Sequence, residues 1–230
     1  MKTLGILILA ILGARLSGQV LLNDNFSGGS LDTGKWQTIL PTGSSSISQS
    51  GGVLTTTGRG ILATANPFST PYVISGVFTM QNDLEHFNIT FRTNLSDSGS
   101  SYERPGMLIA FSNDGNQVSI QRFTNASDWN LLASSSYSLT TGQSYTFSIT
   151  DTGSSITLAI NGTNVISATS TYSTGNHVGF YSREFASTST AIDSVTISAI
   201  PEPSTYALIA GAITLGVIVV RKRTKKSFVE

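Results

Sequence analysis

Short runs of alternating apolar and polar residues recur between positions 20 and 199, and this pattern predicts strands. Two of the runs fold back around a turn dipeptide: residues 107–123 around Asp114-Gly115 and residues 155–169 around Asn161-Gly162. An Asn-Gly or Asp-Gly pair between alternating runs is a strong signal of a β-hairpin. Further strands are predicted at 20–26, 52–57, 60–64, 72–80, 87–92, 144–151, 177–181 and 191–199.

No part of this segment keeps an apolar period of 3.6 residues with capping signals, so helices are not expected there. Many short strands in one segment predict an all-β fold, an antiparallel two-sheet jelly-roll sandwich. In the strand at 87–92, Phe87, Ile89 and Phe91 should share one face, with Asn88, Thr90 and Arg92 on the other. The Ser/Gly-rich run at 43–52 is interpreted as a turn or loop.

Composition indicates a domain that is exported from the cytoplasm. Charged residues make up 11% of the chain, against about 25% in an average soluble domain, and Ser, Thr, Gly and Asn are abundant. There is no cysteine, so stability must come from the core and not from disulfides. Residues 19–200 hold six basic and eleven acidic residues, and the domain lacks the Lys/Arg cluster that a nucleic-acid partner would need.

The first eighteen residues have the three parts of a secretory signal peptide. Lys2 is followed by an apolar stretch from Leu4 to Leu12 and by the small residues Ser17 and Gly18 at the expected cleavage region, close to Arg15. This stretch is shorter than the ~20 residues that span a bilayer, which favours a cleaved signal over an anchor. We therefore expect the chain to be exported.

The other end of the chain has the features of a short membrane-spanning helix. Residues 204–220 are uncharged and mostly apolar, at the lower limit of ~17 residues for a spanning helix. A basic cluster follows immediately, composed of Arg221, Lys222, Arg223, Lys225 and Lys226. Such a cluster stays on the cytoplasmic side, so the rest of the chain is predicted to lie outside.

This end resembles the PEP-CTERM sorting signal of Gram-negative bacteria. The resemblance rests on Pro201, Glu202 and Pro203, the apolar segment and the basic cluster together, over residues 201–226. It implies recognition and removal of the tail by an exosortase after passage through the secretion machinery. The chain would be held transiently in the inner membrane and then reach the cell surface or an extracellular polysaccharide matrix. Three parts are thus expected: a signal peptide (1–18), a β-sandwich (19–200) and a sorting signal (201–226).

The segment between these ends resembles concanavalin A-like lectin and glucanase domains of the laminin-G-like kind. The resemblance rests on the opening "NDNFSGGSLDTGKW" (23–36) and the closing "STSTAIDSVTIS" (187–198). It implies that the first and last strands lie side by side, and it raises both glycan binding and glycan cleavage as functions.

Cleavage has little support in the residues. Retaining hydrolysis needs two carboxyl groups about 5–5.5 Å apart, and the Glu-x-Asp-x-x-Glu strand common in enzymes of this fold is absent. The nearest candidates are Asp83 with Glu85, or Glu103 brought near by folding, and His86 and His177 lie far apart in sequence. No catalytic residue is assigned and the chain is expected not to be an enzyme, with a glycoside hydrolase or lyase kept as the alternative.

Glycan binding is assigned to aromatic faces beside hydrogen-bonding groups. The candidates are Trp129, Tyr102 and Arg104, while Trp36 is expected in the core. A purely structural matrix protein without a ligand is a further alternative. No cofactor is expected apart from a possible calcium ion, which takes oxygen ligands from loops, with Asp24, Asn25 and Asp193 as candidates if the terminal strands pair.

Overall fold

The computed structural model describes residues 18–39, 45–58, 60–82, 86–94, 105–125, 128–183 and 189–201. Residues Val20–Ala199 form one compact unit, separate from Met1–Gln19 and Ile200–Glu230. Every secondary-structure element within the described ranges is a β-strand. Residues 1–17 of the expected signal peptide, Glu202, Pro203 and the rest of the tail lie outside these ranges. The described ranges contain no helix with the length and hydrophobicity to cross a membrane.

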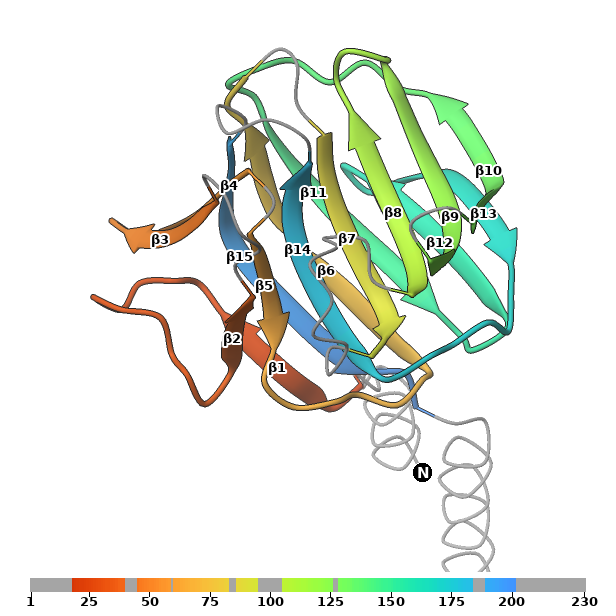
Figure 1. The fold of residues 1–230 in the computed structure, drawn as a ribbon, viewed down its shortest axis with the longest axis horizontal. Coiled ribbons are helices and arrows are strands. Elements are labelled where there is room, and N and C mark those ends of the chain that lie inside the picture. The colour runs from red at the N-terminus through yellow and green to blue at the C-terminus, as the bar shows by residue number, and fades with distance from the viewer. Residues whose placement is uncertain are drawn as a thin grey trace, which may run out of the picture. The chain divides into compact units, whose positions relative to one another are not determined.

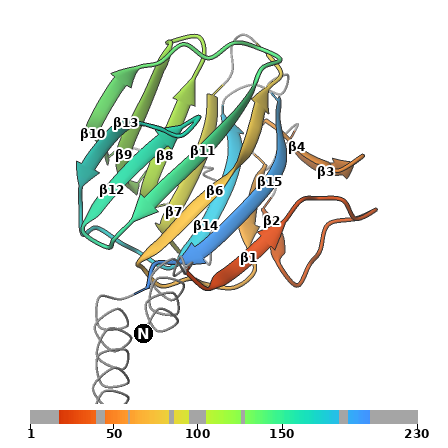
Figure 2. The same ribbon diagram turned by 180° about the vertical axis from the view of Figure 1, so that it is seen from behind.

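The described strands form two antiparallel sheets that pack as two layers (Figures 1 and 2). The eight-stranded sheet has the order β13 (Thr163–Thr169), β12 (Ser155–Ile160), β11 (Ser144–Asp151), β6 (Tyr72–Met80), β15 (Ser189–Ala199), β4 (Val53–Thr57) and β3 (Ser46–Ser50), with β1 (Val20–Asp24) also paired to β15. The seven-stranded sheet has the order β10 (Asp128–Ser136), β9 (Gln117–Asn125), β8 (Gly106–Ser112), β7 (His86–Thr93), β14 (His177–Arg183), β5 (Ile61–Thr64) and β2 (Trp36–Ile39). The predicted two-sheet antiparallel sandwich is confirmed.

The first and last strands of the domain lie side by side, as the family resemblance implies. β1 pairs antiparallel with β15, so that Asn23 lies opposite Thr196 and Asp24 opposite Val195. Pro201 follows β15 after a single residue, so the chain leaves the sandwich next to the strand where it entered.

Both predicted hairpins are present. β12 and β13 join at Asn161-Gly162, where φ values of 50° and 77° fit the two-residue turn that favours Asn-Gly. β8 and β9 also pair, with Ser112 opposite Gln117. Their loop is four residues long, and its left-handed residue is Asn116, with φ of 44°, rather than Gly115.

Three strands were not predicted: β2, β3 and β10. The interpretation of residues 43–52 as a loop is wrong for Ser46–Ser50, which pair with β4 through a Gly51-Gly52 turn. This strand has a single apolar residue, Ile47, so it shows little alternation in sequence. Hydrogen bonding to β4 across the Gly51-Gly52 hairpin makes it a strand, although its own residues show little β-propensity.

The core lies between the two sheets and is rich in aromatic side chains. Phe78 of β6 is fully buried and its ring lies 4.9 Å from that of Phe87 and 4.8 Å from that of Phe111, both in the opposite sheet. Trp36 is 1% exposed and packs beside Phe180, with ring centroids 6.0 Å apart, so its expected place in the core is confirmed. Both sheets therefore share one core, which fixes their stacking.

β7 shows where the predicted alternation holds and where it fails. Phe87, Ile89 and Phe91 face the core, while Asn88 and Thr90 lie opposite Ala110 and Leu108 on the outer face. Arg92 departs from this pattern because β7 has one extra residue relative to β14. Thr90 and Thr93, three residues apart, pair with Gly179 and His177, which are only two residues apart, and Arg92 takes a φ of 50°. This bulge turns the side chain to Asp151 on the core-facing side of β11.

The resulting Arg92–Asp151 ion pair joins the two sheets. Arg92 is 3% exposed and Asp151 0% exposed. Arg92 Nε donates to Asp151 Oδ2 at 2.8 Å, Nη2 donates to Oδ1, and Nη1 donates to the Ser170 carbonyl at 2.7 Å. Burial, reinforced by the nearby Asp151 charge, raises the pKa of the Tyr72 phenol beside this pair.

Candidate functional site

The most exposed aromatic side chain of the described residues lies on β10, the edge strand of the seven-stranded sheet (Figure 1). Trp129 is 55% exposed and Leu131 is 45% exposed. The register places Trp129 opposite Phe123 and Leu131 opposite Gln121. Opposed residues of an antiparallel pair project to the same side, so these four side chains share the outer face of the sheet. We call this set the Trp129 surface.

The Trp129 surface combines a planar apolar group with an amide. Phe123 is 5% exposed and packs on the outer face of β9. Gln121 Nε2 donates a hydrogen bond to Ser119 Oγ at 2.7 Å, and this bond orients the Gln121 amide. Register shifts on either side of Trp129 and Leu131 twist β10 at this point. An exposed indole beside an oriented amide suits a ligand with both C–H faces and hydroxyl groups.

Of the predicted glycan-binding residues, the structure places Trp129 alone. Tyr102 and Arg104 lie outside the described residues, as do the carboxylates Asp83, Glu85 and Glu103. Sequence reasoning missed the companions of Trp129, which are Leu131, Gln121 and Phe123. The alternation of 129 with 131 and of 121 with 123 was a usable signal, but only the register between β9 and β10 brings the two pairs together.

The calcium candidates are partly brought together, and Asp24 is already bound by protein donors. β1 and β15 pair, so Asp24 lies opposite Val195, two residues beyond Asp193. Asp24 Oδ2 accepts a hydrogen bond from Trp36 Nε1 at 2.8 Å and Oδ1 accepts one from Phe26 N at 2.9 Å. Asp24 thus orients the core indole.

Asn25 and Asp193 add little to a cation site. The Asn25 side chain accepts from Ser27 N at 3.2 Å in a local turn. Asp193 is half-buried in β15 at a register shift. Over the described ranges, no three acidic, His or Cys side chains gather in a way that could hold a metal ion. Among the described residues, Asp24, Asn25 and Asp193 thus form no acidic cluster, and calcium binding stays a prediction.

The other described carboxylates with known partners hold the structure in place. Asp151 pairs with Arg92 in the core. Asp114 lies 3.1 Å from His86 Nε2 at the β8–β9 turn. A hydrogen bond from the Ser112 hydroxyl lowers the pKa of Asp114, and the nearby His86 acts in the same direction. Asp32 Oδ1 accepts from Gly34 N at 2.9 Å.

The two histidines lie on separate parts of the seven-stranded sheet. His86 is at the start of β7, and His177, at the start of β14, has Nδ1 2.9 Å from the Thr64 carbonyl. A carbonyl accepts only, so Nδ1 carries the proton there. Each histidine is held by a local partner, and the structure does not bring them together.

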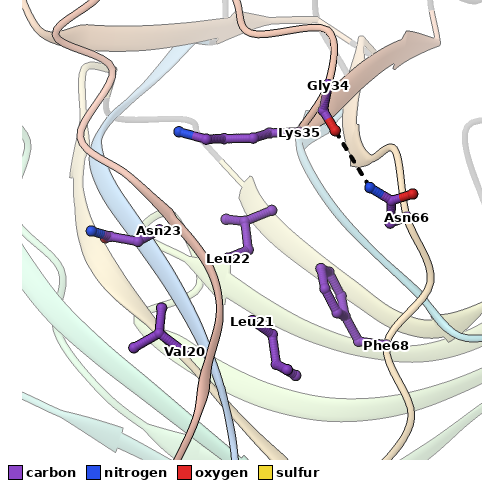
Figure 3. Close-up of a pocket in the computed structure, with 8 residues that line it drawn as sticks. All are labelled: Val20, Leu21, Leu22, Asn23, Gly34, Lys35, Asn66 and Phe68. Atoms are coloured by element: carbon purple, nitrogen blue, oxygen red, sulfur yellow. Dashed lines mark hydrogen bonds between the residues drawn. The ribbon is translucent and has the colours of Figure 1, made fainter.

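A pocket of about 400 Å³ opens beside β1, and no sequence pattern pointed to it. Figure 3 shows its mixed lining of apolar side chains and polar groups: Val20, Leu21, Leu22, Asn23, Gly34, Lys35, Asn66 and Phe68. Asn66 Nδ2 donates to the Gly34 carbonyl at 3.4 Å across one side. The Lys35 ammonium lies 3.7 Å from both Asp24 and Asp32, so its charge is balanced within the protein.

Comparisons with known proteins concern the fold. No family model matches the sequence, and a search of curated proteins finds no match. A carbohydrate binding module, CBM66 from Bacillus subtilis, superposes with a TM-score of 0.58 at 13% identity, covering 72% of this chain and 96% of that one. A protein of unknown function with a galectin-like fold from Bacillus subtilis gives 0.64 at 12% identity, covering 79% and 96%.

A third similar structure is the β-glucanase of Bacillus licheniformis, with a TM-score of 0.57 at 12% identity, covering 80% of this chain and 99% of that one. At identities this low, the similarity concerns the backbone and not the site residues. The domain Val20–Ala199 therefore has the two-sheet β-sandwich fold of concanavalin A-like and galectin-like proteins.

Proposed function

We propose that this chain is an exported protein whose sandwich binds polysaccharide at the Trp129 surface and does not cleave it. The observation that carries this proposal is the indole of Trp129, which is 55% exposed beside an oriented amide. An indole packs its face against the C–H face of a sugar ring, and an amide exchanges hydrogen bonds with ring hydroxyls. Trp129 and Leu131 are both exposed on this face of β10, and neighbouring exposed apolar side chains rimmed by polar groups favour a ligand.

Similar folds support polysaccharide as the class of ligand. One of the similar structures is named a carbohydrate binding module and another a β-glucanase. Because one fold carries both binding and cleavage, the choice between them must come from the residues of this chain. The described carboxylates with known partners are engaged in structural contacts, which favours binding.

The alternative is a glycoside hydrolase or lyase with an atypical acid pair. It would draw on Asp83, Glu85 or Glu103, which lie outside the described residues. A catalytic carboxyl would have to stand about 5–5.5 Å from a second one in a retaining hydrolase, or about 6.5–9.5 Å in an inverting one. A structural matrix protein without any ligand is the other alternative, and in that case Trp129 would be an exposed residue of the sheet edge without a bound partner.

The same proposal includes sorting at the cell envelope. Pro201-Glu202-Pro203, the apolar segment 204–220 and the basic cluster after it form the three-part signal, and Pro201 follows the last strand at once. Two prolines fix φ and remove amide donors, which keeps this strip extended and accessible to a protease. An exosortase would then release the sandwich to the cell surface or its polysaccharide matrix.

Trp129→Ala should weaken retention on a polysaccharide by about ten- to thirtyfold, which corresponds to ~1–2 kcal/mol of lost stacking. Affinity electrophoresis of the purified chain in gels that contain single polysaccharides measures this loss. Val20→Ala is the matched control, because Val20 is 57% exposed on the other sheet. Tyr102→Ala tests the second predicted aromatic in the same gels.

Retention without release of reducing sugar supports binding over catalysis. Steady sugar release that Glu85→Gln or Glu103→Gln abolishes would establish the hydrolase instead. If Trp129→Ala and the unaltered chain are retained equally, the binding site does not include Trp129. If the chain is retained on no glycan, the structural protein is favoured.

The mature protein in its native host should lack the end of the chain. Exosortase cleavage near Pro201-Glu202-Pro203 would remove the apolar segment and the basic cluster, Arg221 to Lys226. Intact-mass measurement of protein recovered from the cell exterior checks this expectation. Alanine at both Pro201 and Pro203 should leave the tail attached, and a mature species that still carries Arg221 would contradict the sorting proposal.

A further inference from the structure

Among the described strands, β3 is an edge strand whose own residues include no charge, proline or bulge that would hinder pairing with another chain. Edge strands are commonly blunted by charges, prolines or bulges. Its counterparts at the other sheet edges carry such features: β10 has two register shifts and β13 pairs through one. β2 is four residues long and directly follows Lys35. β3 reads Ser-Ile-Ser-Gln-Ser, pairs with β4 without a shift, and projects beyond its neighbours in both views (Figures 1 and 2).

The hairpin determines which backbone groups of β3 face outward. Gly51 and Gly52 have φ values of 60° and 83°, which fit a two-residue turn closed by Ser50 opposite Val53. In such a turn the closing pair is hydrogen-bonded, and hydrogen-bonded pairs alternate along the strand. Ser50, Ser48 and Ser46 therefore direct N–H and C=O to β4. Ile47 and Gln49 direct theirs to the outer edge, where no strand of the described ranges pairs with them.

We propose that this edge binds a second copy of the same chain, with two β3 strands antiparallel about a two-fold axis at Ser48. Ile47 of one copy then lies opposite Gln49 of the other, and these pairs exchange four backbone hydrogen bonds. The two eight-stranded sheets become one continuous sheet. A two-fold interface uses the same patch on both copies.

The sequence of β3 is self-complementary in this register. Ser46 meets Ser50 and Ser48 meets its own copy, and hydroxyl groups in cross-strand pairs hydrogen-bond and stabilise the sheet. No residue from Ser45 to Leu54 is charged, so two copies meet without like-charge repulsion. Ser46, Ser48 and Ser50 are exposed, while Ile47 packs against the core and Gln49 is held by the Gly28 carbonyl at 2.7 Å. The strand is thus held in place before it meets a partner.

The dimer should be weak and useful at high local concentration. Two five-residue strands bury far less than the ~1,600 Å² of a standard interface. A dimer would nevertheless carry two Trp129 surfaces on one particle, and linked binding sites raise the avidity for a repeating polymer. The pairing itself does not depend on glycan binding, so the two proposals can fail separately.

Cysteine trapping tests the register directly, because the natural chain has no cysteine. At the two-fold axis the Cα atoms of the two Ser48 residues would lie about 4.5 Å apart, within the range for a disulfide. Ser48→Cys in the full chain, kept in detergent at micromolar concentration, should form a cross-linked dimer on mild oxidation. Ser50→Cys is the matched control on the same strand, since two copies of it would stand roughly 13 Å apart.

A second variant tests the association without any cross-link. Ser48→Lys places two ammonium groups opposite one another, so sedimentation velocity should show at least a threefold smaller dimer fraction than for the unaltered chain at equal concentration. Its glycan retention per site should stay the same. The proposal is overturned if Ser50→Cys cross-links as fast as Ser48→Cys, if neither variant cross-links, or if Ser48→Lys leaves the dimer fraction unchanged.

Discussion

Replacing Asp151 with alanine is expected to lower the free energy of unfolding by about 3–5 kcal/mol. The substitution leaves the Arg92 guanidinium, which is 3% exposed, without its carboxylate. Asp151 accepts hydrogen bonds from two nitrogens of Arg92 and one from Gly153 N. Because Arg92 belongs to the seven-stranded sheet and Asp151 to the eight-stranded sheet, the loss loosens the contact between the layers. Urea unfolding followed by tryptophan fluorescence measures the change.

Asp114→Ala is the control for this substitution. The Asp114 side chain is 40% exposed beside His86, so its pair should contribute less than ~1 kcal/mol. The double variant Arg92→Met/Asp151→Ala should lose much less unfolding free energy than the sum of the losses in the two single variants. In the double variant no uncompensated charge remains in the core. If the unfolding free energy of Asp151→Ala lies within about 1 kcal/mol of that of the unaltered chain, the pair does not stabilise the sandwich.

Phe78→Ala is expected to lower the free energy of unfolding by about 3–5 kcal/mol, the range for a buried phenylalanine replaced by alanine. Phe78 is 0% exposed and its ring contacts four others, those of Phe87, Phe111, Tyr145 and Phe147, at centroid distances of 4.9, 4.8, 5.7 and 6.1 Å. Two of these rings belong to each sheet. The cavity would therefore open at the centre of the core, where neither sheet can close it alone.

Denaturant midpoints of Phe78→Ala and Phe78→Leu give a graded measure of this cavity. A leucine side chain fills most of the volume of the Phe78 ring, so Phe78→Leu should lower the free energy of unfolding clearly less than Phe78→Ala. Leu131→Ala, at a residue 45% exposed on β10, should change stability by less than ~0.5 kcal/mol. Equal midpoints for Phe78→Ala and Leu131→Ala would be incompatible with a single core between the sheets.

Strands with clear apolar alternation were predicted well from sequence. Phe87, Ile89 and Phe91 face the core as expected, because a period of two leaves one apolar face that must be buried. β3 was missed since it carries one apolar residue and forms only by pairing with β4. Arg92 was placed on the wrong face because an extra residue in β7 shifts the register against β14. A bulge depends on the neighbouring strand, which the local sequence does not contain.

The candidate site follows the same division. Trp129 was chosen for its residue type, and its exposure on β10 is consistent with that choice. The pairing with Phe123 and the neighbouring Gln121 required the register of β9 and β10. Asp24 was considered for calcium because of its oxygen atoms, yet the fold brings Trp36 Nε1 and Phe26 N to those atoms.

The sequence by itself determined the class of fold, the hairpins and the expectation of export, because alternation, turn dipeptides and apolar length are local properties of a chain. Tertiary structure alone decided which side chains meet across sheets and strands: Arg92 with Asp151, Asp24 with Trp36, and Trp129 with Phe123. Those meetings join residues up to 59 positions apart in the case of Arg92 and Asp151. They depend on strand order and register, which the packing of the whole core selects.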